Sequence, residues 1–60
     1  MIDIIWHCSW ERIGETRTPC VPRKGELVAL NGVYFSVESI IWVFNQGINN
    51  SHVEIHVRKV

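Results

Sequence analysis

The dipeptide Asn31-Gly32 is the feature that most limits what this chain can fold into. It joins two apolar segments rich in strand-forming residues, and Asn-Gly accepts positive φ at both central positions of a two-residue type I′ turn. The twist of this turn matches the twist of the strands on either side of it. Residues 25–44 are therefore predicted to form a β-hairpin.

The length of the turn fixes the register of this hairpin. A two-residue loop places Leu30 opposite Val33 and Val28 opposite Phe35. One face of the hairpin then carries the large apolar side chains and is predicted to face the core. These side chains are Val28, Leu30, Val33, Phe35 and Val37.

The alternation of the second strand slips after Val37. Glu38 and Ser39 are adjacent polar residues, and large apolar residues resume at Ile40. A β-bulge at Glu38-Ser39 would account for the slip and would bend a long strand, as the corner of a small barrel requires. A short helical turn over residues 39–44 is the alternative.

Two further segments alternate with the period of a strand, residues 2–10 and residues 51–60. The first directs Ile2, Ile4, Trp6, Cys8 and Trp10 to one face. The second directs Val53, Ile55 and Val57 to one face and His52, Glu54, His56 and Arg58 to the other. Residues 11–24 contain a glycine and two prolines and show no period, so they are predicted to form a long loop, and residues 45–50 a polar turn.

Together these segments predict an all-β fold. Four or five short antiparallel strands, with a long loop after the first, are typical of a small SH3-like or OB-like open barrel that forms a single domain over residues 1–60. Trp6 and Trp42 are predicted to lie in its core. A domain of this size buries only about 60% of its unfolded surface. A homo-oligomer formed through strand edges at residues 2–10 or 51–60 is therefore possible.

Composition and charge narrow the classes of partner. Six basic and six acidic residues cancel, which leaves no long-range attraction to phosphate backbones or anionic membranes. The first ten residues lack the basic leader of a signal peptide, and the longest uncharged run is too short to span a bilayer. We expect a cytoplasmic protein without membrane contact, in which Cys8 and Cys20 remain thiols.

The pattern His52-x-Glu54-x-His56 is the sharpest chemical signal in the chain. Successive members stand about 6.6 to 7 Å apart along a strand, so all three could meet one ion only on a bent strand or with help from another chain. We therefore predict no metal and no cofactor, and interpret the three residues as a titratable contact surface.

No pattern of an enzyme is found in the sequence. His7 and Cys8 are neighbours on a predicted strand and point to opposite faces, so His7 is not placed to activate the thiol. Phosphate loops, nucleophile elbows and HExxH patterns do not occur in the 60 residues. The protein is predicted not to be an enzyme.

Residues 22–42 contain an ordered series of a proline, a glycine-acid pair, a turn, an aromatic residue and a tryptophan. The residues are Pro22, Gly25, Glu26, Val28, Asn31, Gly32, Phe35, Val37, Ile40 and Trp42. This order resembles that of many small phage and bacterial proteins, over roughly residues 22–60. The resemblance implies an SH3-like barrel, a phage-encoded protein in the host cytoplasm, and anti-defence inhibition of a host protein by direct binding.

The predicted function is that of a non-enzymatic protein-binding module that uses the 11–24 loop and an exposed aromatic or histidine-bearing face. The alternative is that the basic loop and exposed aromatics bind single-stranded nucleic acid or a nucleotide. The candidate binding residues are Trp10, Arg12, Arg17, Arg23, Lys24, Tyr34, His52, Glu54 and His56.

Overall fold

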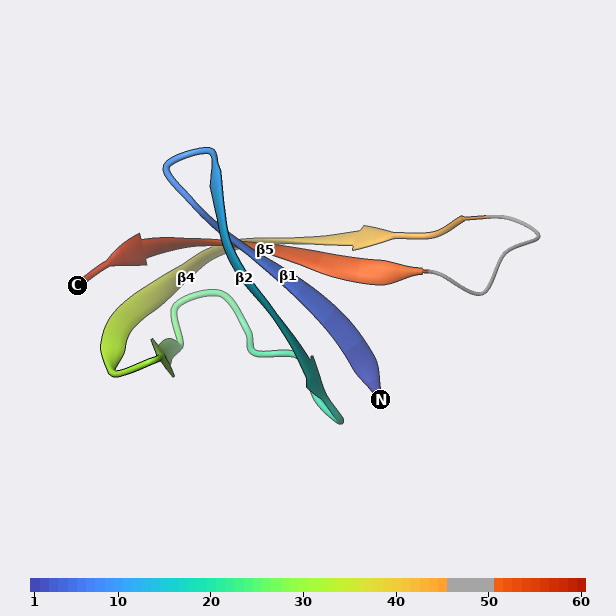
Figure 1. Ribbon diagram of the computed structural model, residues 1–60, viewed down its shortest axis with the longest axis horizontal. Coiled ribbons are helices and arrows are strands. Elements are labelled where there is room, and N and C mark those ends of the chain that lie inside the picture. The colour runs from blue at the N-terminus through green and yellow to red at the C-terminus, as the bar shows by residue number, and fades with distance from the viewer. Residues whose placement is uncertain (46–50) are drawn as a thin grey trace.

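The computed structural model describes residues 1–45 and 51–60, so most of the turn predicted at 45–50 lies outside the described residues. Five strands form one sheet in these ranges: β1 (Ile2–Cys8), β2 (Glu11–Thr18), β3 (Leu27–Leu30), β4 (Val33–Val43) and β5 (His52–Lys59). Figure 1 shows the sheet strongly twisted, with β1 and β2 crossing β4 at a steep angle. The predicted all-β, small barrel-like fold is confirmed.

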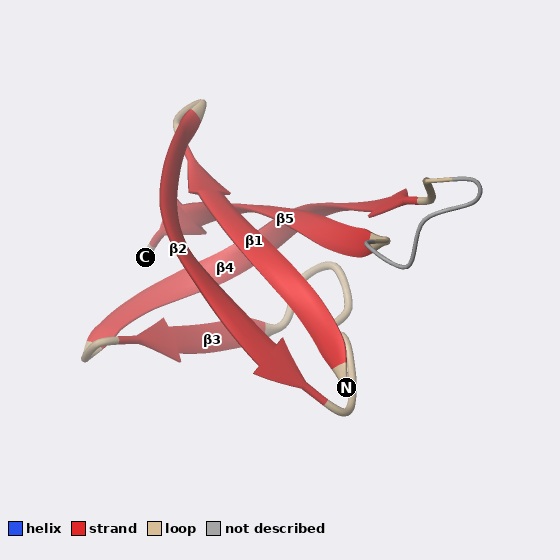
Figure 2. Ribbon diagram, turned by 45° about the vertical axis from the view of Figure 1, so that its right-hand side comes forward, coloured by secondary structure: helices blue, strands red, loops and turns tan. Residues whose placement is uncertain are grey.

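The strands follow the order β2-β1-β5-β4-β3 across the sheet. Neighbouring strands are antiparallel except β1 and β5, which run parallel. The sheet curls into a half-barrel whose edges are β2 and β3 (Figure 2). The strands at residues 2–10 and 51–60 were predicted to offer open edges, and this is wrong, because β1 and β5 are both interior strands. No local pattern reveals that the first and last strands of a chain pair with each other.

The hairpin of β3 and β4 confirms the register predicted from Asn31-Gly32. Leu30 pairs with Val33 and Val28 with Phe35, and the two turn residues have φ values of 51° and 82°. The pairing extends beyond β3, where the Val37 amide donates to the Glu26 carbonyl over 2.9 Å.

The bulge predicted at Glu38-Ser39 is also confirmed. The register of β4 against β5 shifts between Val37 and Ser39, so Glu38 is the extra residue. Beyond it β4 continues to Val43 as a strand, and the alternative of a helical turn over residues 39–44 is wrong.

The predicted loop over residues 11–24 is wrong for its first half, because Glu11–Thr18 forms the edge strand β2. Its backbone pairs with β1 except at Ile13, where the register shifts, while most of its side chains are exposed. A strand with nearly all side chains in solvent carries no apolar period. One side-chain contact joins it to the core, where the Trp6 indole donates to Thr16 Oγ1 over 2.8 Å.

The core lies on the concave face of the half-barrel, beneath β1, β4 and β5. Its buried residues are Ile4, Trp6, Phe35, Val37, Val53, Ile55 and Val57. Cys8, Val28 and Leu30 pack against this cluster, and Val21 covers it from the loop after β2. Trp42 was predicted to be buried, and this is wrong, because its side chain is 52% exposed. Trp42 lies beyond the bulge, near the end of β4, where little of the sheet remains to cover it.

Candidate binding face

The convex face of the sheet, opposite the core, carries a cluster of four titratable side chains. Alternation along β5 directs His52, Glu54 and His56 away from the core, and the parallel register places His7 of β1 beside His56. Glu54 stands between two histidines, with Oε1 3.0 Å from His7 Nε2 and Oε2 3.0 Å from His52 Nε2. The rings of His7 and His56 stack with centroids 4.9 Å apart. We call these four residues the histidine cluster.

The hydrogen bond from His52 is the main cause that lowers the pKa of Glu54. Desolvation, the second-largest effect, opposes it, and the charges of His7 and His52 lower the pKa further. The Glu54 side chain is 31% exposed, so water screens part of these interactions. Nε2 of His7 is itself shielded from solvent. It meets the distance of an ion pair with Glu54 but forms no hydrogen bond of good geometry with the described residues. The cluster therefore contains a buried nitrogen directed at a carboxylate but poorly aligned with it.

Trp10 lies on the two-residue turn between β1 and β2. Cys8 and Glu11 close it as a strand pair, and Ser9 and Trp10 have φ values of 53° and 68°. Asparagine and glycine suit such a turn, whereas a bulky residue with positive φ is an outlier. The Trp10 side chain is 91% exposed.

An open groove lies beside Trp10, with a volume of about 310 Å³. We call it the Trp10 groove, and it is lined by Ser9, Trp10, Glu38, Ser39, Ile41, His56 and Val57. The bulge in β4 contributes Glu38 and Ser39 to its wall. The Trp10 indole contacts His56 edge-on, with ring centroids 5.8 Å apart, so His56 belongs both to the groove and to the histidine cluster.

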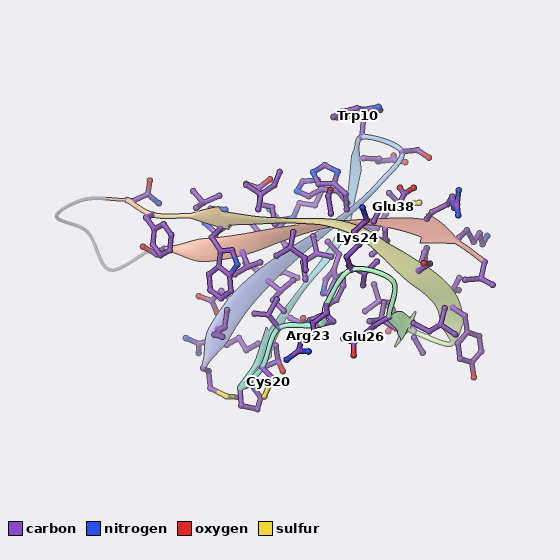
Figure 3. All side chains as sticks on the ribbon, turned by 180° about the vertical axis from the view of Figure 1, so that it is seen from behind. Trp10, Cys20, Arg23, Lys24, Glu26 and Glu38 are labelled. Atoms are coloured by element: carbon purple, nitrogen blue, oxygen red, sulfur yellow. The ribbon has the colours of Figure 1, made fainter. Side chains whose placement is uncertain are left out.

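The basic residues predicted to bind do not gather into one patch. Arg12 lies 3.5 Å from Glu15, and Arg17 forms an ion pair of 2.7 Å with Asp3. Arg23 and Lys24 lie on the segment that follows β2, whereas Trp10 lies on the turn between β1 and β2 (Figure 3). Three of the nine candidates, His52, Glu54 and His56, come together in the cluster, and Trp10 joins them through His56.

The exposed aromatic residues are likewise dispersed. Tyr34, at 64% exposure, lies five residues along β4 from Ser39, the partner of His56. That is about 15 Å of strand. Trp42 and Phe44 stack on each other with centroids 6.3 Å apart, at the other end of β4. Trp10 is the exposed aromatic residue that lines the groove.

Several contributors to this face were not identified from the sequence, among them His7, Ser9, Glu38, Ser39 and Ile41. His7 carried a readable signal, because its phase within β1 directs it away from the core. Its proximity to the β5 residues carried no signal, since that proximity depends on the parallel pairing of the two ends of the chain. The predicted separation of His7 and Cys8 is confirmed, with Cys8 packed on the core side.

Comparison with known proteins finds no family model that matches the chain and no similar curated protein or solved structure. The described residues also contain no helix long and apolar enough to cross a membrane.

Proposed function

We propose that this protein is a non-enzymatic protein-binding module that docks its partner at the Trp10 groove. The observation that carries the proposal is the exposure of Trp10. Its indole is almost fully in solvent, and its backbone has a positive φ that is unfavourable for tryptophan. A left-handed conformation costs a non-glycine residue about 1 to 2 kcal/mol. Backbone outliers of this kind concentrate at functional sites.

The surroundings of Trp10 suit a protein partner. Tryptophan is among the residues that contribute most binding energy at interfaces, where it is buried in a pocket of the partner. The adjoining groove offers the exposed apolar side chain of Ile41 beside the polar groups of Glu38 and Ser39. An interface of this kind combines an apolar centre with a polar rim.

The resemblance of residues 22–60 to small phage and bacterial proteins supports a more specific version of the proposal. In that version the protein is phage-encoded, the partner is a host defence protein, and binding inhibits it. Inhibition then requires only that the docked sheet cover a surface that the host protein uses. This version assigns no chemistry to the chain, in keeping with the dispersed acidic residues.

Binding of single-stranded nucleic acid or a nucleotide has less support. Such sites combine aromatic platforms with a continuous basic groove. Here Arg12 and Arg17 face acidic residues, and Trp10 and Tyr34 lie on separate parts of the molecule.

The test is a tagged capture from host lysate, with and without nuclease, using the wild type, Trp10→Gly and Tyr34→Ala. Tyr34→Ala is the matched control because it removes another exposed aromatic ring outside the groove. We expect one stoichiometric protein that survives nuclease, is lost with Trp10→Gly and is retained with Tyr34→Ala. Retention by Trp10→Gly would contradict docking at the groove, and capture of nucleic acid alone would favour the alternative.

A further inference from the structure

The histidine cluster brings together three metal-ligating side chains from two strands. Each of His7, Glu54 and His56 offers one ligand atom, and these three atoms all lie within 4.8 Å of one another. The parallel register explains the arrangement, since His7 is the direct neighbour of His56 and Glu54 stands two residues before it on the same face. We propose that His7, Glu54 and His56 bind a single zinc-class divalent ion, with His52 orienting the carboxylate.

Only a small movement would bring the three ligand atoms to the separations found in a tetrahedral zinc site. Zinc bonds of about 2.0 to 2.2 Å imply ligand atoms about 3.3 to 3.5 Å apart in a tetrahedron. His7 Nε2 and Glu54 Oε1 stand 3.0 Å apart already, and the remaining donors must approach by at most about 1.5 Å. Rotation of the two imidazole rings out of their stacked arrangement supplies that movement.

The donor set selects the class of metal. Two imidazole nitrogens and one carboxylate oxygen suit zinc and its transition-metal neighbours, whereas calcium and magnesium prefer sites built from oxygen alone. Three protein ligands leave a fourth position for water or for a group from a partner.

Two features of the cluster are typical of metal sites whose ligands are oriented by neighbouring groups. The Nε2 atom of His7 is shielded from water and has no well-aligned hydrogen bond among the described residues, so ligation would satisfy it. The second oxygen of Glu54 receives a contact of 3.0 Å from His52 Nε2, which orients the carboxylate. Outer partners of this kind typically contribute 10- to 100-fold, as an order of magnitude, to metal affinity.

This inference does not depend on the proposed protein partner. The proposed ligand set also differs from the one considered from the sequence, in which His52, Glu54 and His56 all lay on one strand and were too far apart to share an ion. The third ligand comes from β1, and the outermost residue of the β5 pattern, His52, acts on the carboxylate. A metal at this position would fix the ring of His56 and with it one wall of the Trp10 groove.

The experiment titrates zinc and cobalt into the full chain carrying no polyhistidine tag, by calorimetry and by the visible spectrum of tetrahedral cobalt. The ligand variants are His7→Asn, Glu54→Gln and His56→Asn. The control is the double variant Cys8→Ser with Cys20→Ser, which removes both thiols. Circular dichroism and thermal melting in the absence of zinc establish that each variant is folded.

We expect one ion per chain, a rise in Tm with zinc, and unchanged affinity in the thiol control. Each ligand variant should lose more than about 100-fold in affinity, and His52→Asn about 10- to 100-fold. Three outcomes would overturn the site: no saturable binding by the folded wild type, affinity unaltered in Glu54→Gln, or affinity lost with the thiols. One ion per two chains, with a zinc-dependent dimer mass, would also overturn it.

Discussion

The indole of Trp10 meets the imidazole of His56 edge-on, with ring centroids 5.8 Å apart. His56 in turn stacks on His7, so a single side chain connects the exposed turn to the interior of the histidine cluster. The contact arises because the β1–β2 turn and the middle of β5 lie side by side in the parallel register. The two proposals therefore concern neighbouring regions of one convex face, and each can be tested without disturbing the core.

Replacing Trp10 with glycine should increase stability while it abolishes docking. The change removes an unfavourable positive φ, and we expect the free energy of unfolding to rise by about 1 kcal/mol. The lost ring contact with His56 opposes this gain only weakly, since Trp10 is 91% exposed. Urea denaturation of the purified variant measures the change. A fall in the urea midpoint would show that Trp10 stabilises the fold and would weaken the argument from strain.

Gly32→Ala is the complementary change and should destabilise the protein by about 1 kcal/mol. Gly32 has a φ of 82°, and a Cβ built there meets no atom within 4 Å. The cost is therefore one of backbone conformation and not of collision. The urea midpoint should decrease without a change in m-value, and an unchanged midpoint would contradict the type I′ turn.

Phe35→Ala should cost about 3 to 5 kcal/mol, because Phe35 is a large buried side chain of the core. A small domain has only about 5 kcal/mol or a little more to lose, so this variant should be largely unfolded at 37 °C by circular dichroism. Tyr34→Ala, one residue away on the exposed face, should change stability by no more than about 0.5 kcal/mol. Similar melting curves for the two variants would show that the faces of β4 are assigned wrongly.

Local patterns predicted the parts of the fold that depend on neighbours in sequence. The turn at Asn31-Gly32 fixed the register of β3 and β4, and two adjacent polar residues revealed the bulge at Glu38. Alternation in β5 correctly separated the core residues from His52, Glu54 and His56. These predictions succeeded for the same reason, because each feature depends on residues that lie close together in the sequence.

The parts that were missed depend on pairing across the chain or on solvent exposure. β2 exists because its backbone completes a ladder with β1, and its exposed side chains give no period. His7 reached the cluster through the parallel pairing of β1 with β5, which a sequence pattern cannot show. The turn at Ser9-Trp10 was missed because neither residue favours positive φ.

Thr16→Val tests whether residues 11–18 form a strand against the core. Valine matches threonine in shape and favours strands, but it removes the oxygen that accepts the Trp6 indole hydrogen bond of 2.8 Å. We expect a loss of about 1 kcal/mol in stability and a change in tryptophan fluorescence. If this segment were a free loop, the substitution would be silent.

The pH dependence of stability should reveal the cluster around Glu54 in the absence of metal. The pKa of Glu54 is lowered, chiefly by the hydrogen bond from His52, so the folded state binds a proton less readily than the unfolded state. The stabilisation is therefore fully present above the unfolded carboxyl pKa of about 4.3 and is lost as pH falls through the lower folded pKa. The groups that face Glu54 are His7 from β1 and His52 on β5.

Glu54→Gln provides the matched comparison for this titration, because the amide keeps the shape and an acceptor oxygen while it removes the ionisation. In the presence of a chelator, the urea midpoints of the two proteins should differ most above the unfolded carboxyl pKa of about 4.3, where Glu54 is ionised. The difference should shrink as the pH falls through the lowered pKa of Glu54, because the wild type then takes up a proton on that carboxylate. Parallel curves from pH 6 to pH 3 would show that Glu54 does not sense His52 in the folded protein.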